Sequence, residues 1–185
     1  MIHFFLKLFR YLYRLSGSDY YTDIPQGLFF TNWVFQKVWK VNDDVPYSVH
    51  YTSLISGSSN IHFPAGDKAI RKSFAVSGGC YFGIAEGSRL EIGEGTIWAW
   101  NVNIQTANHD LIHRDQFRVQ DIKIGKNCWL GGNVTILPGV ELGDGVTVGA
   151  NSVVTKSFPA GVVIAGVPAR IIRDLKQSNP SGGTV

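Results

Sequence analysis

The feature that most constrains the fold is an aliphatic residue at every sixth position in the C-terminal half of the chain. No polar residue interrupts this column, which runs through Ile124, Leu130, Ile136, Leu142, Val148 and Val154. Glycine follows most of these positions, as Gly125, Gly131, Gly143 and Gly149. Residues six apart in an α-helix lie about 120° apart around its axis, so a helix would scatter the column over its whole surface. The column therefore predicts short strands joined by tight turns.

The same period predicts how the strands stack. A coil with three sides repeats after about 18 residues, so Ile124 should lie beside Leu142, and Leu130 beside Val148. The six-residue step is also visible earlier in the chain, at Val49, Ile55 and Ile61 and again at Ile92, Trp98 and Ile104. Because a single coil leaves its strand edges unpaired, stability has to come from stacking the coils into a solenoid.

Breaks in the period divide the chain. We expect an N-terminal extension over residues 1–45, a repeat domain over residues 46–168, and a short C-terminal helix with a flexible tail over residues 169–185. Within the repeat domain, residues 63–83 predict a loop or an irregular coil, and residues 110–121 predict a charged loop insertion. The aromatic-rich stretch Gly27–Val41 fits a helix or a strand. The overall prediction is a mainly β, parallel solenoid flanked by two extensions.

Charge and cysteine content argue against two classes of protein. The formal net charge is +3, and Lys7, Arg10 and Arg14 alone carry as many positive charges as this excess. The remaining chain is nearly balanced and lacks the basic stripe that is typical of nucleic-acid-binding proteins. Cys80 and Cys128 have no CxxC spacing, so neither a disulfide framework nor a thiolate zinc site is expected. We expect a cytoplasmic protein with no nucleic-acid partner.

The N-terminal residues 2–15 have an amphipathic pattern. His3, Lys7, Arg10 and Arg14 recur at helical offsets, and the opposite face of such a helix is aromatic and aliphatic. A helix of this kind either lies in a membrane interface or packs its apolar face on protein. It is too short to span a bilayer, and its charges argue against a signal peptide. Peripheral contact with the inner face of a membrane is therefore one of two readings.

Four sequence blocks carry a resemblance to a known family. They are Thr106-Ala107-Asn108-His109, Ile124 to Gly132, Val148 to Lys156 and Ala165 to Arg170. Over about Ile92 to Arg173 the chain is similar to the hexapeptide-repeat acyltransferases, in the branch of maltose, galactoside and polysaccharide O-acetyltransferases. The resemblance implies a left-handed parallel β-helix, a homotrimer with active sites between subunits, and acetyl-CoA as cosubstrate, with no metal.

The resemblance also implies the chemistry of the site. His109 matches the general base, since a neutral imidazole can take a hydroxyl proton near pH 7. We expect either Asp110 or a backbone carbonyl to orient His109, and the amides around Gly131 and Gly132 to stabilise the oxyanion. Positions that match coenzyme contacts are Trp129, Gly131, Gly132, Ala150, Thr155, Lys156, Arg170 and Arg173.

The acceptor side departs from the family. The sugar-binding asparagine of the family is replaced here by Gly79, which puts simple maltose or galactoside specificity in doubt. Trp100, Asn101 and Asn103 are candidate contacts to a sugar, although Trp100 also suits a contact between subunits. The expected acceptor is a hydroxyl of a sugar or glycan, such as a surface-polysaccharide precursor.

Three alternatives compete with this hypothesis. A drug-modifying acetyltransferase would share the coenzyme machinery. A zinc hydratase similar to γ-type carbonic anhydrases would need three histidines, drawn from His109, His113, His50 and His62. A non-enzymatic trimeric scaffold would not need His109 at all.

Overall fold

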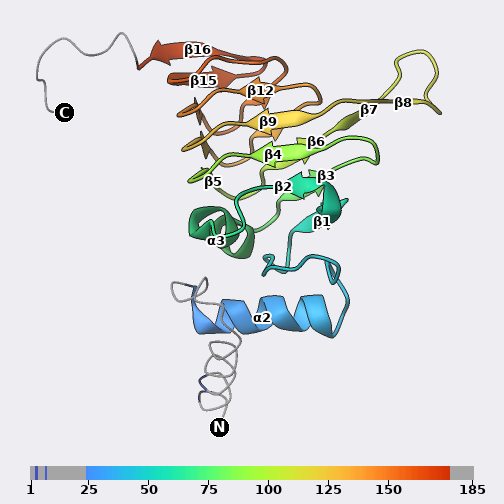
Figure 1. Ribbon diagram of the computed structural model, residues 1–185, viewed down its shortest axis with the longest axis vertical. Helices are drawn as coiled ribbons and strands as arrows, with labels where there is room; N and C mark the ends of the chain where they lie inside the picture. The colour runs from blue at the N-terminus through green and yellow to red at the C-terminus, as the bar shows by residue number, and fades with distance from the viewer. Residues whose placement is uncertain (1–2, 4–6, 8–23, 176–185) are drawn as a thin grey trace, which may run out of the picture.

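The computed structural model describes residues 24–175 together with His3 and Lys7, and it is mainly β (Figure 1). The predicted amphipathic segment 2–15, apart from those two residues, and the predicted flexible tail over residues 178–185 lie outside this description. The elements are α2 (Gln26–Lys37), β1 (Leu54–Ser56), the 3₁₀ helix η2 (Ser58–Asn60), β2 (Ile61–His62), α3 (Lys68–Val76), β3 (Tyr81–Gly83), β4 (Leu90–Ile92), β5 (Ile97–Trp98), β6 (Asn103–Gln105), β7 (Ala107–His109), β8 (Phe117–Val119), β9 (Ile122–Ile124), β10 (Trp129–Leu130), β11 (Thr135–Ile136), β12 (Glu141–Leu142), β13 (Thr147–Val148), β14 (Val153–Val154), β15 (Val162–Gly166) and β16 (Ala169–Asp174).

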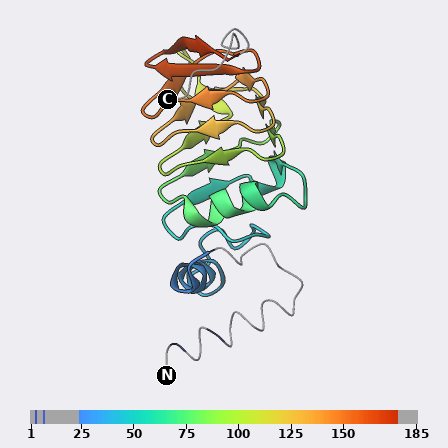
Figure 2. The same cartoon turned by 90° about the vertical axis from the view of Figure 1, so that its left-hand side faces the viewer.

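Three sheets form the sides of a stack of coils. Sheet A has the order β1-β3-β6-β11-β14, sheet B the order β12-β9-β4-β2, and sheet C the order β16-β15-β13-β10-β5. The chain visits B, C and A in turn, so each regular coil adds one strand to every sheet, and Figure 2 shows the coils lying one above another. All pairs within these sheets are parallel except β15 with β16.

The six-residue column forms the core, as the sequence predicts. Ile124 pairs with Leu142, and Leu130 pairs with Val148, so the expected stacking register is confirmed. These side chains point inward and are buried, and Trp98 is buried in the same column. Apolar burial on this scale is the main favourable term in folding, and here every coil contributes to one continuous core.

The turns between sheets C and A repeat an asparagine. Asn101, Asn133 and Asn151 have φ values of 60°, 58° and 58°, a left-handed conformation that asparagine tolerates better than most residues. Their side chains form a ladder, in which Asn101 Nδ2 donates to Asn133 Oδ1 at 2.9 Å and Asn133 Nδ2 donates to Asn151 Oδ1 at 3.0 Å. The ladder ties successive coils together along this corner.

The helices α2 and α3 lie toward the N-terminal end of the stack (Figure 1). The stretch 63–83 is an irregular coil, as predicted, because α3 follows β2 and precedes β3 where a regular coil has a strand of sheet C. Asp67 caps α3 by accepting the Ile70 N–H at 3.0 Å. Ser77 Oγ donates to the Trp98 carbonyl at 2.7 Å and joins the end of α3 to β5. The undecided stretch 27–41 contains most of α2.

The predicted C-terminal helix is wrong for the described residues. Ala169–Asp174 form strand β16, which pairs antiparallel with β15. The helix-like spacing of Ile171, Ile172 and Leu175 is local, whereas β15 offers a row of backbone N–H and C=O groups that a returning strand can pair. That pairing covers the open edge of β15 and makes β16 the last strand of sheet C.

The predicted insertion is a β-hairpin rather than an irregular loop. Strands β7 and β8 pair antiparallel, with His109 opposite Phe117, and the hairpin projects from the side of the stack (Figure 1). It leaves the coil after β6 of sheet A, and the chain rejoins the stack at β9 of sheet B. No helix in the described part of the chain is both long and apolar enough to cross a bilayer.

Candidate active site

His109 ends strand β7 at the base of the loop that closes the hairpin. Its Nδ1 lies 2.6 Å from the carbonyl oxygen of Arg114. Because a carbonyl can only accept, Nδ1 carries the proton in this contact, and in the neutral imidazole Nε2 then holds the lone pair. The orienting group is thus a backbone carbonyl, which was one of the two expected alternatives.

Asp110, the other expected orienting group, is engaged elsewhere. Its Oδ1 accepts the N–H groups of Ile112 and His113, and its Oδ2 accepts from Arg118. The hydrogen bonds from the His113 and Ile112 N–H groups and from the Arg118 guanidinium lower the pKa of Asp110 to about 2. Asp110 is therefore a charged element of the loop at neutral pH.

A pocket of about 240 Å³ lies beside His109. Its lining includes two aromatic rings and two hydrogen-bonding side chains, from Tyr81, Phe117, Gln105 and Ser56. The Phe117 ring centroid lies 4.4 Å from that of His109. Sequence reasoning missed these four residues, since Ser56, Tyr81 and Gln105 come from three successive strands of sheet A that meet only through stacking.

The predicted acceptor residues divide between two places. Asn103 lies on sheet A and accepts from Gln105 Nε2 at 2.9 Å, so it supports one side chain of this pocket. Trp100 and Asn101 precede β6, whereas His109 lies beyond the other end of that strand. The centroid of the Trp100 ring lies 5.0 Å from that of the His50 ring, and Asn101 belongs to the asparagine ladder. The structure does not bring these two residues to His109.

Gly79 has a structural role at the position where the family has a sugar-binding asparagine. Its φ is +69°, and a Cβ there would collide with the side chain of Asn101. Gly79 thus lies beneath Asn101, next to the asparagine ladder in the turn between sheets C and A.

The coenzyme candidates lie in the C-terminal half of the stack. Trp129 is 53% exposed on the outer face of sheet C, between Ile97 and Thr147 in register. Gly131, Gly132 and Ala150 follow in the turns between sheets C and A. Thr155 and Lys156 follow β14, in the same kind of turn from sheet A to sheet B that carries the hairpin, and Arg170 and Arg173 are on β16.

One of the two expected oxyanion donors is excluded. The N–H of Gly131 donates to the Val148 carbonyl at 2.8 Å and so belongs to the ladder between coils. Gly132 is the remaining candidate of the pair. Within a single chain, Trp129 is on sheet C and these glycines precede a strand of sheet A, while His109 lies beyond the other end of the sheet A strands.

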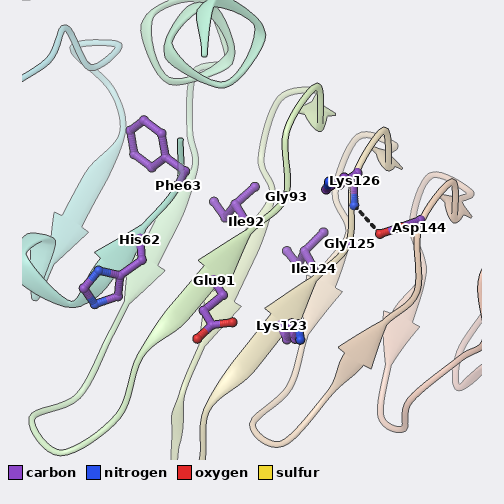
Figure 3. Close-up of a pocket in the computed structure, with 10 residues that line it drawn as sticks. All are labelled: His62, Phe63, Glu91, Ile92, Gly93, Lys123, Ile124, Gly125, Lys126 and Asp144. Atoms are coloured by element: carbon purple, nitrogen blue, oxygen red, sulfur yellow. Dashed lines mark hydrogen bonds between the residues drawn. The ribbon is translucent and has the colours of Figure 1, made fainter. Parts of the chain in front are cut away.

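A second hollow, of about 520 Å³, lies along the outer face of sheet B (Figure 3). His62, Glu91 and Lys123 stand in register on three adjacent strands and line it, and Lys126 N donates to Asp144 Oδ1 at 2.7 Å at its edge. None of the residues expected to bind acceptor or coenzyme lines this hollow. We therefore centre the site on the hairpin pocket.

The histidines considered for zinc are spread over three parts of the fold. His50 packs on Tyr51 and Trp100, and His62 is on β2. His109 and His113 are on the hairpin, at the end of β7 and in the loop that follows. Among the described residues, no three His, Cys, Asp or Glu side chains gather closely enough to hold a metal ion.

Comparison with known proteins gives consistent matches. The family described as bacterial transferase hexapeptide (six repeats) matches residues 121–156. The galactoside O-acetyltransferase of Escherichia coli (strain K12) is 38% identical over 96 residues, covering 50% of this chain and 47% of that protein. A second relative is WbbJ of the same strain, which is named as a lipopolysaccharide biosynthesis O-acetyl transferase. It is 43% identical over 106 residues, covering 50% of this chain and 54% of that protein.

A solved structure agrees with these matches. The maltose O-acetyltransferase of Clostridium difficile 630 is 34% identical with a TM-score of 0.54, covering 66% of this chain and 63% of that one. The chain spans about half the length of the two curated relatives above. Over its repeats the chain is therefore similar to bacterial hexapeptide transferases, and the matched relatives are named as O-acetyltransferases.

Proposed function

We propose that the chain is an acetyl-CoA-dependent O-acetyltransferase that acts on a hydroxyl of a sugar or glycan, with His109 as general base. The observation that carries the proposal is the contact between His109 Nδ1 and the Arg114 carbonyl at 2.6 Å. It leaves Nε2 as the proton acceptor, on a residue that lines a pocket. The names of the relatives support acetyl transfer to sugars.

The pocket suits a sugar ring. Tyr81 and Phe117 offer aromatic faces for the C–H groups of a pyranose, and Gln105 and Ser56 offer hydrogen bonds to its hydroxyls. His109 lies at the wall formed by Phe117, so a bound hydroxyl within about 3 Å of Nε2 can lose its proton as it attacks. The likeness to WbbJ favours a polysaccharide precursor as the acceptor class.

The proposed reaction is a direct transfer. Acetyl-CoA supplies a thioester carbonyl carbon. Nε2 of His109 takes the hydroxyl proton while the acceptor oxygen forms its bond to that carbon, and the carbon–sulfur bond then breaks. His109 returns the proton to the departing sulfur, which leaves as a thiol. The amide of Gly132 is our candidate donor to the oxyanion.

The residues proposed to hold the coenzyme fit its chemistry. Trp129 presents an exposed ring, and the small residues at Gly132 and Ala150 let a pantetheine arm approach the backbone, while Gly131 keeps the coils beneath it closely stacked. Lys156, Arg170 and Arg173 offer positive charge to phosphates, and Thr155 a hydroxyl.

We further propose that the coils wind as a left-handed β-helix and that three copies assemble with active sites between them. Two observations support assembly. His109 and Trp129 lie on different sides of one chain, so one copy has to supply the base and another the coenzyme surface. The tip of the hairpin exposes Leu111 and Ile112 by 79% and 82%, an apolar surface suited to contact with a neighbour.

The test is acetyl transfer from radiolabelled acetyl-CoA to a panel of sugars and glycans by His109→Ala. We expect kcat to fall at least about a hundredfold, while the Kd for coenzyme A stays within about twofold. His113→Ala, on the same hairpin, is the matched control and should keep its activity. Comparable turnover in His109→Ala would sink the proposal and favour a scaffold or another base.

A further inference from the structure

We propose that Asp110 and Arg118 are positioning residues that set the tautomer of His109 through the shape of the hairpin loop. The proposal rests on the proposed function only in taking His109 as the base. It concerns an interaction network that no part of the catalytic assignment requires: a carboxylate and a guanidinium that hold a backbone carbonyl against the imidazole.

The carboxylate of Asp110 is the centre of the network. Oδ1 accepts the backbone N–H of Ile112 at 2.9 Å and that of His113 at 3.0 Å. Oδ2 accepts from Nε of Arg118 at 2.7 Å, and a second guanidinium nitrogen of Arg118 also lies 2.7 Å from it. Hydrogen bonds to an ionised carboxylate are among the stronger ones in proteins. Four contacts on one side chain fix the first half of the loop.

Backbone contacts close the second half. Asp110 N donates to the Gln116 carbonyl at 2.9 Å, and Gln116 N donates to the His113 carbonyl at 2.9 Å. Arg114 lies inside this closed loop, so its carbonyl can turn only if the loop changes shape. The orientation of the carbonyl that contacts His109 is thus determined by Asp110, and Arg118 anchors Asp110 to the opposite strand of the hairpin.

The consequence for His109 is chemical. A free neutral imidazole side chain favours the tautomer with the proton on Nε2. In that tautomer Nε2 has no lone pair with which to take a proton from the acceptor. The Arg114 carbonyl accepts a hydrogen bond from Nδ1 and so selects the other tautomer, which has its lone pair on Nε2. If the loop loosens, part of the population returns to the unproductive tautomer without any change in the imidazole itself.

The experiment reads the tautomer directly. The ¹⁵N shifts of Nδ1 and Nε2 are measured in full-length protein labelled at histidine, at a pH where His109 is neutral, with His109→Ala used to assign its signals. The variants are Asp110→Ala, Asp110→Asn and Arg118→Gln. Asp43→Asn is the matched control, because it removes a carboxylate from an exposed ion pair with Lys40 that is remote from the hairpin in sequence.

We expect the wild type and Asp43→Asn to hold the Nδ1–H form, and Asp110→Ala to shift toward the Nε2–H form. The kcat of Asp110→Ala should fall roughly tenfold to a hundredfold with KM for acetyl-CoA unchanged. Asp110→Asn, which keeps an oxygen for the two N–H groups, should recover part of this loss. Arg118→Gln should give a smaller shift in the same direction, and it replaces Asp110→Ala should that variant fail to fold.

An unchanged Nδ1–H signal in Asp110→Ala and Arg118→Gln would overturn the positioning role and leave the proposed function intact. The tautomer measurement needs no substrate, so it can succeed where the activity assay fails. If Asp110→Ala shows the tautomer shift but the wild type transfers no acetyl group to any acceptor, the proposed function fails while the positioning role stands.

Discussion

Gly131 and Gly132 are neighbours in the proposed coenzyme region, yet the structure predicts opposite responses to the same substitution by alanine. A Cβ on Gly131 would lie 2.7 Å from the Ala150 nitrogen, 2.9 Å from the Val148 oxygen and 3.0 Å from the Ala150 Cα. All three atoms are backbone of the next coil, which cannot rotate away as a side chain could. A Cβ on Gly132 would meet only the Trp100 carbonyl oxygen at 3.6 Å, an ordinary contact.

The size of the difference follows from these distances. Alanine at 131 forces two stacked coils apart by several tenths of an ångström, and overpacking of this kind costs about 1–3 kcal/mol. The separation also stretches the hydrogen bond from Gly131 N to the Val148 carbonyl, now 2.8 Å, whose net value is about 0.5–1.5 kcal/mol. We expect Gly131→Ala to lose about 2–4 kcal/mol. Gly132→Ala should gain up to about 1 kcal/mol, because alanine lowers the entropy of the unfolded chain.

Urea unfolding followed by circular dichroism measures both values, and calorimetry with coenzyme A measures binding by the folded proteins. A Gly131→Ala free energy of unfolding within about 0.5 kcal/mol of that of Gly132→Ala would refute the argument from coil stacking. Weakened binding by Gly132→Ala at unchanged stability would separate a coenzyme contact from turn geometry at that position.

Further predictions concern the core, the hairpin, the proposed coenzyme site and the N-terminus. Leu130→Ala, at a buried position, should lose about 2–5 kcal/mol of unfolding free energy by denaturant titration, against less than about 0.5 kcal/mol for the exposed Ile172→Ala. The hydrogen bonds to the ionised carboxylate of Asp110 stabilise the hairpin and lower the pKa of Asp110 to about 2. This stabilisation is complete above about pH 4 and is lost as the pH falls toward 2. The amide shifts of Ile112 and His113 should therefore titrate near pH 2, and a midpoint near 4 would contradict the network. Lys156→Gln should weaken coenzyme A binding about tenfold at low salt and less at high salt, whereas salt-independent loss would argue against a phosphate contact. Deleting residues 1–15 should abolish salt-sensitive liposome binding, and no binding by the intact chain would refute the membrane reading.

The fold was predictable where one local pattern repeats. The column from Ile124 to Val154 specifies both the inward face and the stacking partner, because every coil must bury the same position, and the pairs of Ile124 with Leu142 and Leu130 with Val148 follow. Strand β16 was not predictable in this way. Its apolar spacing fits a helix, and only the edge offered by β15 decides in favour of a strand.

The candidate site was readable in part for a similar reason. His109 stands in a recognisable block of sequence, but the pocket beside it gathers Ser56, Tyr81 and Gln105 from three coils, and no spacing in the sequence marks them. The sequence does carry a signal for the helix α3. Asp67 is a residue type that caps helices, and Ile70 and Phe74 follow it four residues apart. In the structure Asp67 accepts the N–H of Ile70. For Gly131 the sequence suggests a free amide, but in the structure this N–H donates to the Val148 carbonyl of the next coil. Only the stacking of the coils shows that hydrogen bond.

The hairpin that carries His109 is an insertion between two coils of the stack. It departs after β6 and the chain resumes at β9, and β4 and β9 remain paired in register across the gap. Its length can therefore vary without displacing any coil above or below it. Short insertions and deletions in the hairpin can therefore reshape the part proposed to meet the acceptor, while the coils proposed to meet the coenzyme keep their stacking.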